Sequence, residues 1–375
     1  MNNRPATISI DQLQSFLVRL GLIGGAVLCF YVATTLWESG DIVRQPFSLA
    51  LVIVSYLLAF GLLVAAALRA LPYRAVWVIP ALLLFALFGL ARNRDVNQMQ
   101  NTSLATSDVY LVSDYSANLV RLGQNPYLFD LGDAYRVYRA SSTLQTPTSD
   151  GDFIGKMVYP ALAFLLFVPF QVLGIPTNLI FALFYWLTLL VMFVGAPRLV
   201  RPVILLPLLI EPRYVLYALG GVSDTVWAFL ICLMIVSWRN RSLSAVWFGL
   251  ACALKQQPWL LVPFLAIRLL RDSDEEERTF RLLDALQFFL IAGGVFALVN
   301  LPYILWDFPA WLAGSVSPFF DRMITLGQGL SSLTTEGVVF IPRSMYTIYM
   351  LMGYAVCIFV YWRHTHSLKS LIWLF

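Results

Sequence analysis

The residues best suited to chemistry in this sequence are acids and an amine that lie between long apolar segments. Asp108 and Asp114 lie in one polar stretch, and Lys255 separates two apolar runs. A carboxylate can act as a general base on a hydroxyl group, and a lysine can hold a phosphate as a point charge. The chain has two histidines, His364 and His366, in a basic segment that we assign to the cytoplasm. A general base at the outer face must therefore be a carboxylate.

Membrane-spanning helices are the elements that must position these residues. Hydrophobic residues make up 59% of the 375-residue chain and charged residues 12%, about half the ~25% charged share of soluble proteins. The apolar runs are Leu20–Leu36, Leu49–Leu68, Ala75–Ala91, Met157–Leu173, Leu179–Ala196, Pro202–Ile210, Thr225–Trp238, Leu243–Leu254, Trp259–Ile267, Ala285–Ile304 and Met345–Trp362. We expect an all-α polytopic integral membrane protein, one domain over residues 1–375 with roughly ten transmembrane helices. Another apolar run begins at Leu371, so we expect either a short last helix or a fragment of a longer chain.

Basic loops indicate the orientation of the helices, because Lys and Arg favour the cytoplasmic side. The clearest basic loops are Arg239–Arg241, Arg268–Arg281 and Arg363–Lys369. With a cytoplasmic N-terminus, three crossings place the long polar loop 93–156 outside the cell. Arg198 and Arg201 also favour the cytoplasm, so one of the two preceding apolar runs is expected to be re-entrant or partly interfacial.

The long outer loop contains a predicted amphipathic helix at Tyr110–Leu122, lying on the membrane surface. Gly123 is expected to end this helix and Asn125 to begin a turn. Asp108 lies where the helix begins, so it is either an N-cap or a catalytic acid. Asp114 is either a catalytic acid or part of a solvated face.

Two further polar groups interrupt the apolar runs. Arg213 follows a glutamate and a proline, and Gly220–Asp224 comes shortly after it. Charges near membrane helix ends are costly and are functional candidates, although Asp224 could equally cap the next helix. Lys255 precedes Pro258, which is expected to break the helix into a hairpin with a polar outer tip. Lys255 either snorkels to the interface or binds a phosphate.

Several classes of function lack their motifs here. Neither a G-x-x-x-x-G-K-[ST] nor a G-x-G-x-x-G phosphate loop is present, which argues against an ATPase or a dinucleotide enzyme. No basic stretch with interleaved aromatics indicates nucleic acid. The four cysteines lie in apolar runs and are interpreted as small buried hydrophobes. We expect no protein-dedicated metal site and no cofactor. A divalent ion held by a substrate phosphate and one carboxylate is the alternative.

In this order, the motifs resemble the GT-C superfamily of integral-membrane glycosyltransferases, in particular the bacterial polyprenyl-phosphate-mannose-dependent mannosyltransferases. The matching motifs are Asp108 with the helix that ends at Gly123–Tyr127, then Tyr159–Leu162, Pro212–Tyr217, Gly221–Asp224, Gly249–Lys255, Asn300–Tyr303 and Gly327–Leu330.

The resemblance implies an inverting sugar transfer, of mannose or another hexose, from a polyprenyl-phosphate donor to a lipid or envelope-glycan acceptor. It implies Asp108 as the base, with Asp114 in reserve, and Lys255 and Arg213 on the donor phosphate. Further substrate contacts are expected from Tyr110, Tyr127, Tyr159, Asp224, Gln256 and Gln328. The expected location is the bacterial plasma membrane, in contact with its lipids, with the site facing outward.

Two other classes of function compete with the transferase. A transporter or flippase of lipid-linked sugars could use the same charged interface without chemistry. Transporters carry ionisable residues in the middle of their helices, whereas the acids here gather in loops and at helix ends. A non-catalytic membrane scaffold would leave the combination of Asp108 and Lys255 unexplained.

Overall fold

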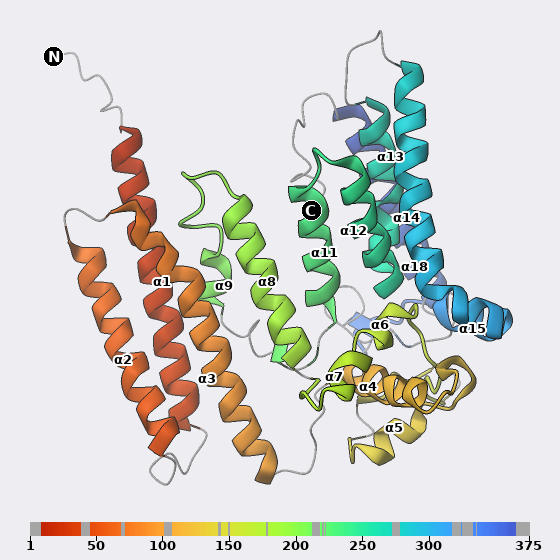
Figure 1. The fold of residues 1–375 in the computed structure, drawn as a ribbon, viewed down its shortest axis with the longest axis horizontal. Helices are drawn as coiled ribbons and strands as arrows, with labels where there is room; N and C mark the ends of the chain where they lie inside the picture. The colour runs from red at the N-terminus through yellow and green to blue at the C-terminus, as the bar shows by residue number, and fades with distance from the viewer. Residues whose placement is uncertain are drawn as a thin grey trace. The chain divides into compact units, whose positions relative to one another are not determined.

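The regular secondary structure of the described residues is helical. The computed structural model describes residues 9–38, 46–68, 72–100, 107–141, 144–148, 151–177, 179–211, 218–219, 221, 223–271, 278–316, 324, 333–334 and 336–364. Within these residues helices are joined by turns, with one isolated bridge between Pro147 and Phe153 and no β-strand (Figure 1). The predicted all-α class is confirmed for these residues.

Among the described residues, five helices are long and apolar enough to cross a membrane. They are α1 (Ile10–Glu38), α2 (Pro46–Ala67), α3 (Val78–Gln100, preceded by the 3-10 helix η2, Tyr73–Trp77), α14 (Arg278–Trp306) and α18 (Arg343–His364). The three predicted spans before the polar loop are thus confirmed as helices of spanning length. The loop starts later than the predicted residue 93, because α3 continues to Gln100. The total of ten spans stays a prediction.

The remaining apolar runs form shorter helices. They are α6 (Leu162–Leu165), α7 (Val168–Val172), α8 (Leu179–Gly195), α9 (Leu206–Ile210), α11 (Asp224–Val236), α12 (Arg241–Leu254), the 3-10 helix η5 (Gln257–Leu261) and α13 (Val262–Arg271). The predicted run 157–173 is not one helix, because Pro169 has no N–H for the carbonyl of Leu165. Neither this run nor 202–210 forms a helix of the ~20 residues that a bilayer requires.

The chain forms two compact units. Unit 1 comprises Met1–Leu111, Val137–Ala140 and Phe170–Cys232, and unit 2 comprises Val112–Arg136, Ser141–Pro169 and Leu233–Phe375. The prediction of a single domain stays a prediction. Helix α4 (Asp108–Arg121) begins in unit 1 and continues in unit 2.

Unit 1 is built on close apolar packing. Helices α1, α2, α3, α8 and α9 share one cluster of buried hydrophobic side chains. A Cβ atom on Gly21 of α1 would lie 2.4 Å from the carbonyl oxygen of Pro202, and one on Gly25 would lie 2.7 Å from Leu82. Small residues thus let the backbones approach, as in other helix contacts within membranes.

Unit 2 is centred on the pair α12 and α14. A Cβ atom on Gly249 of α12 would lie 2.5 Å from the carbonyl oxygen of Ala292 in α14, so the two backbones touch there. The Phe248 and Phe288 rings lie 6.0 Å apart in the same contact. The unit also contains the 3-10 helix η3 (Pro126–Leu128), most of α5 (Gly132–Val137) and α15 (Phe308–Ser315).

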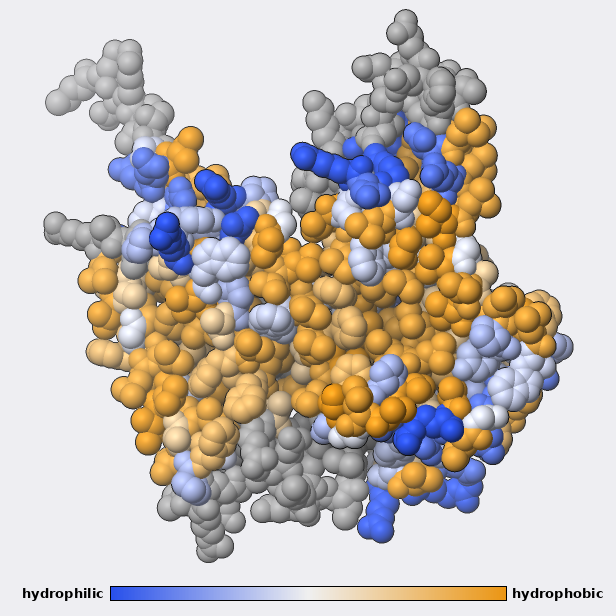
Figure 2. Space-filling view, in the orientation of Figure 1, coloured by the Kyte–Doolittle hydropathy of each residue, from blue (hydrophilic) through white to orange (hydrophobic). Residues whose placement is uncertain are grey.

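Large apolar side chains are exposed on both units (Figure 2). Phe60 of α2 is 68% exposed, and Leu290, Leu298 and Leu305 of α14 are 73%, 72% and 76% exposed. Continuous exposed apolar faces mark contact with a membrane or with another protein. Together with the five long apolar helices, these faces identify an integral membrane protein.

Candidate functional site

Helix α4 carries both candidate acids, Asp108 and Asp114. Its first residues do not match the prediction that Asp108 is the N-cap. Ser107, rather than Asp108, caps the helix, since its hydroxyl accepts from the N–H of Tyr110 at 3.2 Å. The same hydroxyl donates to the carbonyl of Gly221 at 2.9 Å. Asp108 is the first helical residue, and its Oδ1 accepts from the N–H of Val109 at 2.8 Å. A carboxylate in the first turn is stabilised by the helix dipole.

The end of α4 follows the sequence prediction. Gly123 has a positive φ of 72°, its N–H donates to Val120, and the N–H of Gln124 donates to Leu119. This pair of bonds defines a Schellman motif. Asn125 then accepts from the N–H of Tyr127 at 3.1 Å and begins η3, as expected for a turn.

Asp114 is buried within unit 2. It is 8% exposed, and Ser113 and Ser116 on the same helix are 1% and 0% exposed. The alternative of a solvated face for Asp114 is therefore wrong. The Ser116 hydroxyl contacts the sulfur of Met157 at 3.7 Å, so this part of α4 lies against the segment that precedes α6.

Lys255 lies at the predicted break between two helices. Helix α12 ends at Leu254, Lys255 is extended, and η5 contains Pro258. The Lys255 side chain is 6% exposed, and its ammonium lies 5.5 Å from the centre of the Tyr159 ring. An ammonium at this distance is attracted by the aromatic face. Because protein encloses the side chain, the structure does not support the snorkelling alternative.

Two buried carboxamides connect the segments around Lys255. The Nε2 of Gln256 donates to the carbonyls of Val158 and Ser315, both at 2.7 Å. The Oδ1 of Asn300 in α14 accepts from the N–H of Ala161 and from the indole of Trp311, both at 3.0 Å. Both Nε2 hydrogens of Gln256 therefore serve the protein backbone, and only its carbonyl oxygen is left for a substrate.

Tyr127 joins the same group from η3. Its hydroxyl donates to the carbonyl of Tyr159 at 2.8 Å, and its ring packs edge-on against Tyr303 and Phe164 at 5.7 and 5.8 Å. Burial raises the pKa of the Tyr127 phenol well above its ordinary value, so it remains a donor at neutral pH. A Cβ atom on Gly314 would lie 2.7 Å from this ring.

Four predicted site residues thus meet in unit 2: Tyr127, Tyr159, Lys255 and Gln256. Asn300, Trp311 and Ser315 complete the group but are absent from the sequence-based site. Asparagine within a membrane helix is a costly residue, and this signal could have identified Asn300.

Apart from Asp114 of unit 2, the other described candidates lie in unit 1. The hydroxyl groups of Tyr110 and Thr177 are hydrogen-bonded at 2.9 Å, and the ring centres of Tyr110 and Phe181 lie 6.3 Å apart. Asp224 is the first residue of α11, and its Oδ1 accepts from the indole of Trp227 at 2.7 Å. Asp224 is thus the first helical residue, as Asp108 is in α4, and its role as a helix cap stays a prediction. The candidates Arg213 and Gln328 lie outside the described residues.

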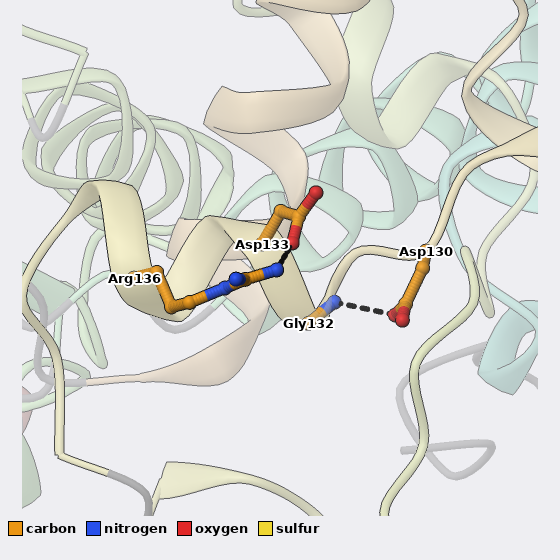
Figure 3. Close-up of polar contacts among 4 residues, drawn as sticks. All are labelled: Asp130, Gly132, Asp133 and Arg136. Carbon is orange, nitrogen blue, oxygen red and sulfur yellow. Dashed lines mark hydrogen bonds and ion pairs between the residues drawn. The ribbon is translucent and has the colours of Figure 1, made fainter.

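Other acids of the polar loop have local structural roles (Figure 3). Asp130 accepts from the N–H of Gly132 at 2.8 Å, which closes a turn. Asp133 pairs with Arg136 one helical turn later in α5, on an exposed surface. Exposed pairs of this kind contribute little to stability. The two acids of α4 are therefore the better candidates for a general base.

The chemical capability of the group in unit 2 is anion binding. A buried ammonium held in a fixed position can stabilise a negative charge that develops on a leaving phosphate. Among the described residues, no three His, Cys, Asp or Glu side chains are grouped as metal ligands. Comparison of the chain with protein-family models, curated proteins and solved structures finds no match.

Proposed function

We propose that this membrane protein is a glycosyltransferase that moves a hexose from a polyprenyl phosphate to a lipid or glycan acceptor. The observation that supports the proposal is the Lys255 ammonium, which is buried against Tyr159 and set among satisfied hydrogen bonds. Burying a charge in a membrane protein is expensive, so such a residue is functional by default.

The proposed reaction is a single displacement at the anomeric carbon of the donor sugar. The acceptor oxygen forms a bond to this carbon while the bond to the phosphate oxygen breaks. The acceptor proton passes to a carboxylate, and the negative charge that develops on the phosphate is stabilised by Lys255. Attack opposite the leaving group inverts the anomeric configuration.

The proposed base is an aspartate of α4. The resemblance implies Asp108, whose carboxylate is half-buried in the first turn. Asp114 is buried in unit 2, the unit that contains Lys255. Both acids therefore enter the test.

The proposed setting is a bacterial plasma membrane, with the site on the extracytoplasmic side of roughly ten spans. A polyprenyl tail keeps the donor in the bilayer, so the reacting bond must lie at the interface. A flippase of lipid-linked sugars would bind the same donor without cleaving it.

Sugar transfer by the purified full-length protein tests this proposal. Radiolabelled polyprenyl-phosphate mannose and a cell-envelope lipid extract are supplied in nanodiscs to wild type, Asp108→Asn and Asp114→Asn. Wild-type transfer, and a loss of about a hundredfold or more in one of the two variants, is the expected result. Donor binding without transfer by the wild type contradicts the enzyme and favours the flippase.

A further inference from the structure

Three buried polar side chains hold the segment Val158–Ala161. Gln256 donates to the first carbonyl of the segment, and Tyr127 donates to the second. Asn300 accepts from the N–H of the last residue. These side chains come from the turn after α12, from η3 and from α14, so three separate elements fix a short stretch that is not helical.

Asn300 has the most connections in this arrangement. It is 0% exposed, and its Oδ1 accepts from the segment and from Trp311 of α15, each at 3.0 Å. Its Nδ2 donates to Phe296 one turn earlier in α14, at 2.9 Å. One side chain thereby ties the segment and α15 to α14.

The close contact of α12 with α14 also fixes the position of Lys255. Gly249 lets the two helix backbones touch, and Lys255 follows the last residue of α12. The Lys255 ammonium lies against the ring of Tyr159, and Tyr159 belongs to the segment that Asn300 holds. The two members of the pair are therefore fixed through a common element, α14.

We propose that Asn300 is a positioning residue that holds Tyr159 and Lys255 together and keeps the ammonium enclosed. Asn300 acts on Lys255 only through the segment and α14. The effect of Asn300 on catalysis rests on the proposed function, whereas its effect on the geometry of Lys255 does not.

Lysine acylation measures this geometry without any substrate. The chain has three lysines, Lys156, Lys255 and Lys369, so peptide mass spectrometry can follow Lys255 by itself. Full-length protein in detergent is treated with N-hydroxysuccinimidyl acetate. The variant Asn300→Leu keeps the side-chain size and removes all three side-chain hydrogen bonds of Asn300. It should speed Lys255 labelling about tenfold through the loss of these buried bonds.

Two further variants separate positioning from loss of folding. Asn300→Asp retains the acceptor oxygen for Ala161 and Trp311 and loses the donor to Phe296 within α14. It should keep Lys255 labelling within about twofold of wild type, because the two bonds that hold the segment and α15 remain. Ser244→Ala removes a buried hydroxyl that donates to Met234 at 2.9 Å, near the start of α12, and should leave Lys255 labelling unchanged.

The outcomes distinguish the two proposals. Unchanged Lys255 labelling in Asn300→Leu, or equal acceleration in Ser244→Ala, overturns the positioning role. In transfer assays, Asn300→Leu should raise KM for the polyprenyl-phosphate donor and lower kcat less. The factor by which KM rises should be about ten times the factor by which kcat falls, because the variant disturbs donor binding. Accelerated Lys255 labelling without any wild-type transfer contradicts the glycosyltransferase and keeps the positioning role.

Discussion

The two units bury different kinds of polar side chain. Among the described residues, unit 1 buries only hydroxyl side chains: Ser48, Ser55, Thr177, Thr188 and Ser223. Unit 2 buries hydroxyls as well, but also a carboxylate, an ammonium and three carboxamides: Asp114, Lys255, Asn125, Gln256 and Asn300. Unit 2 therefore carries the groups that are most costly to remove from water.

The buried polar groups of unit 1 fit a role in helix packing, whereas those of unit 2 fit a role in binding or catalysis. A hydroxyl can satisfy itself within its own helix, as Thr188 does by donating to the carbonyl of Phe184 at 2.7 Å. A buried carboxamide has more polar groups to satisfy than a hydroxyl, and Gln256 and Asn300 bond to distant segments as well. Packing alone does not account for such an arrangement, so the proposed anion site lies in unit 2.

Removing the buried ammonium of Lys255 should have the largest effect on sugar transfer. Lys255→Met keeps the length and apolar stem, and it should lower sugar transfer about a thousandfold, the scale of losing one electrostatic stabiliser. Thermal unfolding in detergent shows whether the variant is folded, so that loss of transfer can be assigned to the missing ammonium. Ser55→Ala removes a buried polar side chain of unit 1, which is 0% exposed, and should retain full transfer as the matched control. Equal loss in both variants would remove the distinction between the units.

The helix contact that supports the site can be tested with a pair of glycines. Gly249→Ala should destabilise the protein by about 3 kcal/mol, because the new methyl group meets the backbone of Ala292 and overpacks the contact. Gly293→Ala in α14 meets nothing within 4 Å and should be neutral or stabilising by ~0.5 kcal/mol. Unfolding midpoints measured in the same detergent compare the two. A stable Gly249→Ala would show that α12 can move away from α14.

The sequence predicted local features of unit 2. The stop at Gly123, the turn at Asn125 and the break at Lys255 all depend on residues within a few positions of each other. Glycine permits the positive φ of a Schellman motif, and proline removes an N–H, so each signal has a local physical cause.

Long-range contacts account for what the sequence did not predict. Gln256 bonds to a carbonyl 98 positions away, and Asn300 bonds to an N–H 139 positions away. Apolar periodicity carries no information about such pairs, so the role of Asn300 was not evident. The break in the run 157–173 was missed for a different reason: the run was defined by its lack of charged residues, and Pro169 carries no charge.

The phenol of Tyr127 offers a smaller test of the polar framework in unit 2. Tyr127→Phe removes the donor to Tyr159 and leaves that carbonyl without this bond. The expected loss is about 1.5 kcal/mol in the free energy of unfolding. Chemical denaturation in detergent at neutral pH measures it, and an unchanged midpoint would show that the bond contributes nothing.

The same variant gives a pH dependence of known sign. The folded protein keeps the Tyr127 proton because its pKa is raised, whereas the unfolded chain releases it above about pH 10. The stability from this group is present below about pH 10 and is lost as the pH rises further. The advantage of wild type over Tyr127→Phe should therefore shrink between about pH 8 and about pH 11. A constant difference would contradict burial of the phenol.

The smallest expected effect concerns a glycine whose role is purely conformational. Gly123 has a positive φ, yet a Cβ atom there meets nothing within 4 Å. Gly123→Ala should therefore cost about 1 kcal/mol, all of it from the left-handed backbone at the end of α4. Gly61→Ala in α2 also meets open space but lies in a regular helix, where it should stabilise by ~0.5 kcal/mol. A lower unfolding temperature for Gly123→Ala and a higher one for Gly61→Ala would show that the first effect comes from backbone strain at the end of α4. The second effect would come from helix propensity within α2. Equal shifts would show that α4 does not need its left-handed end.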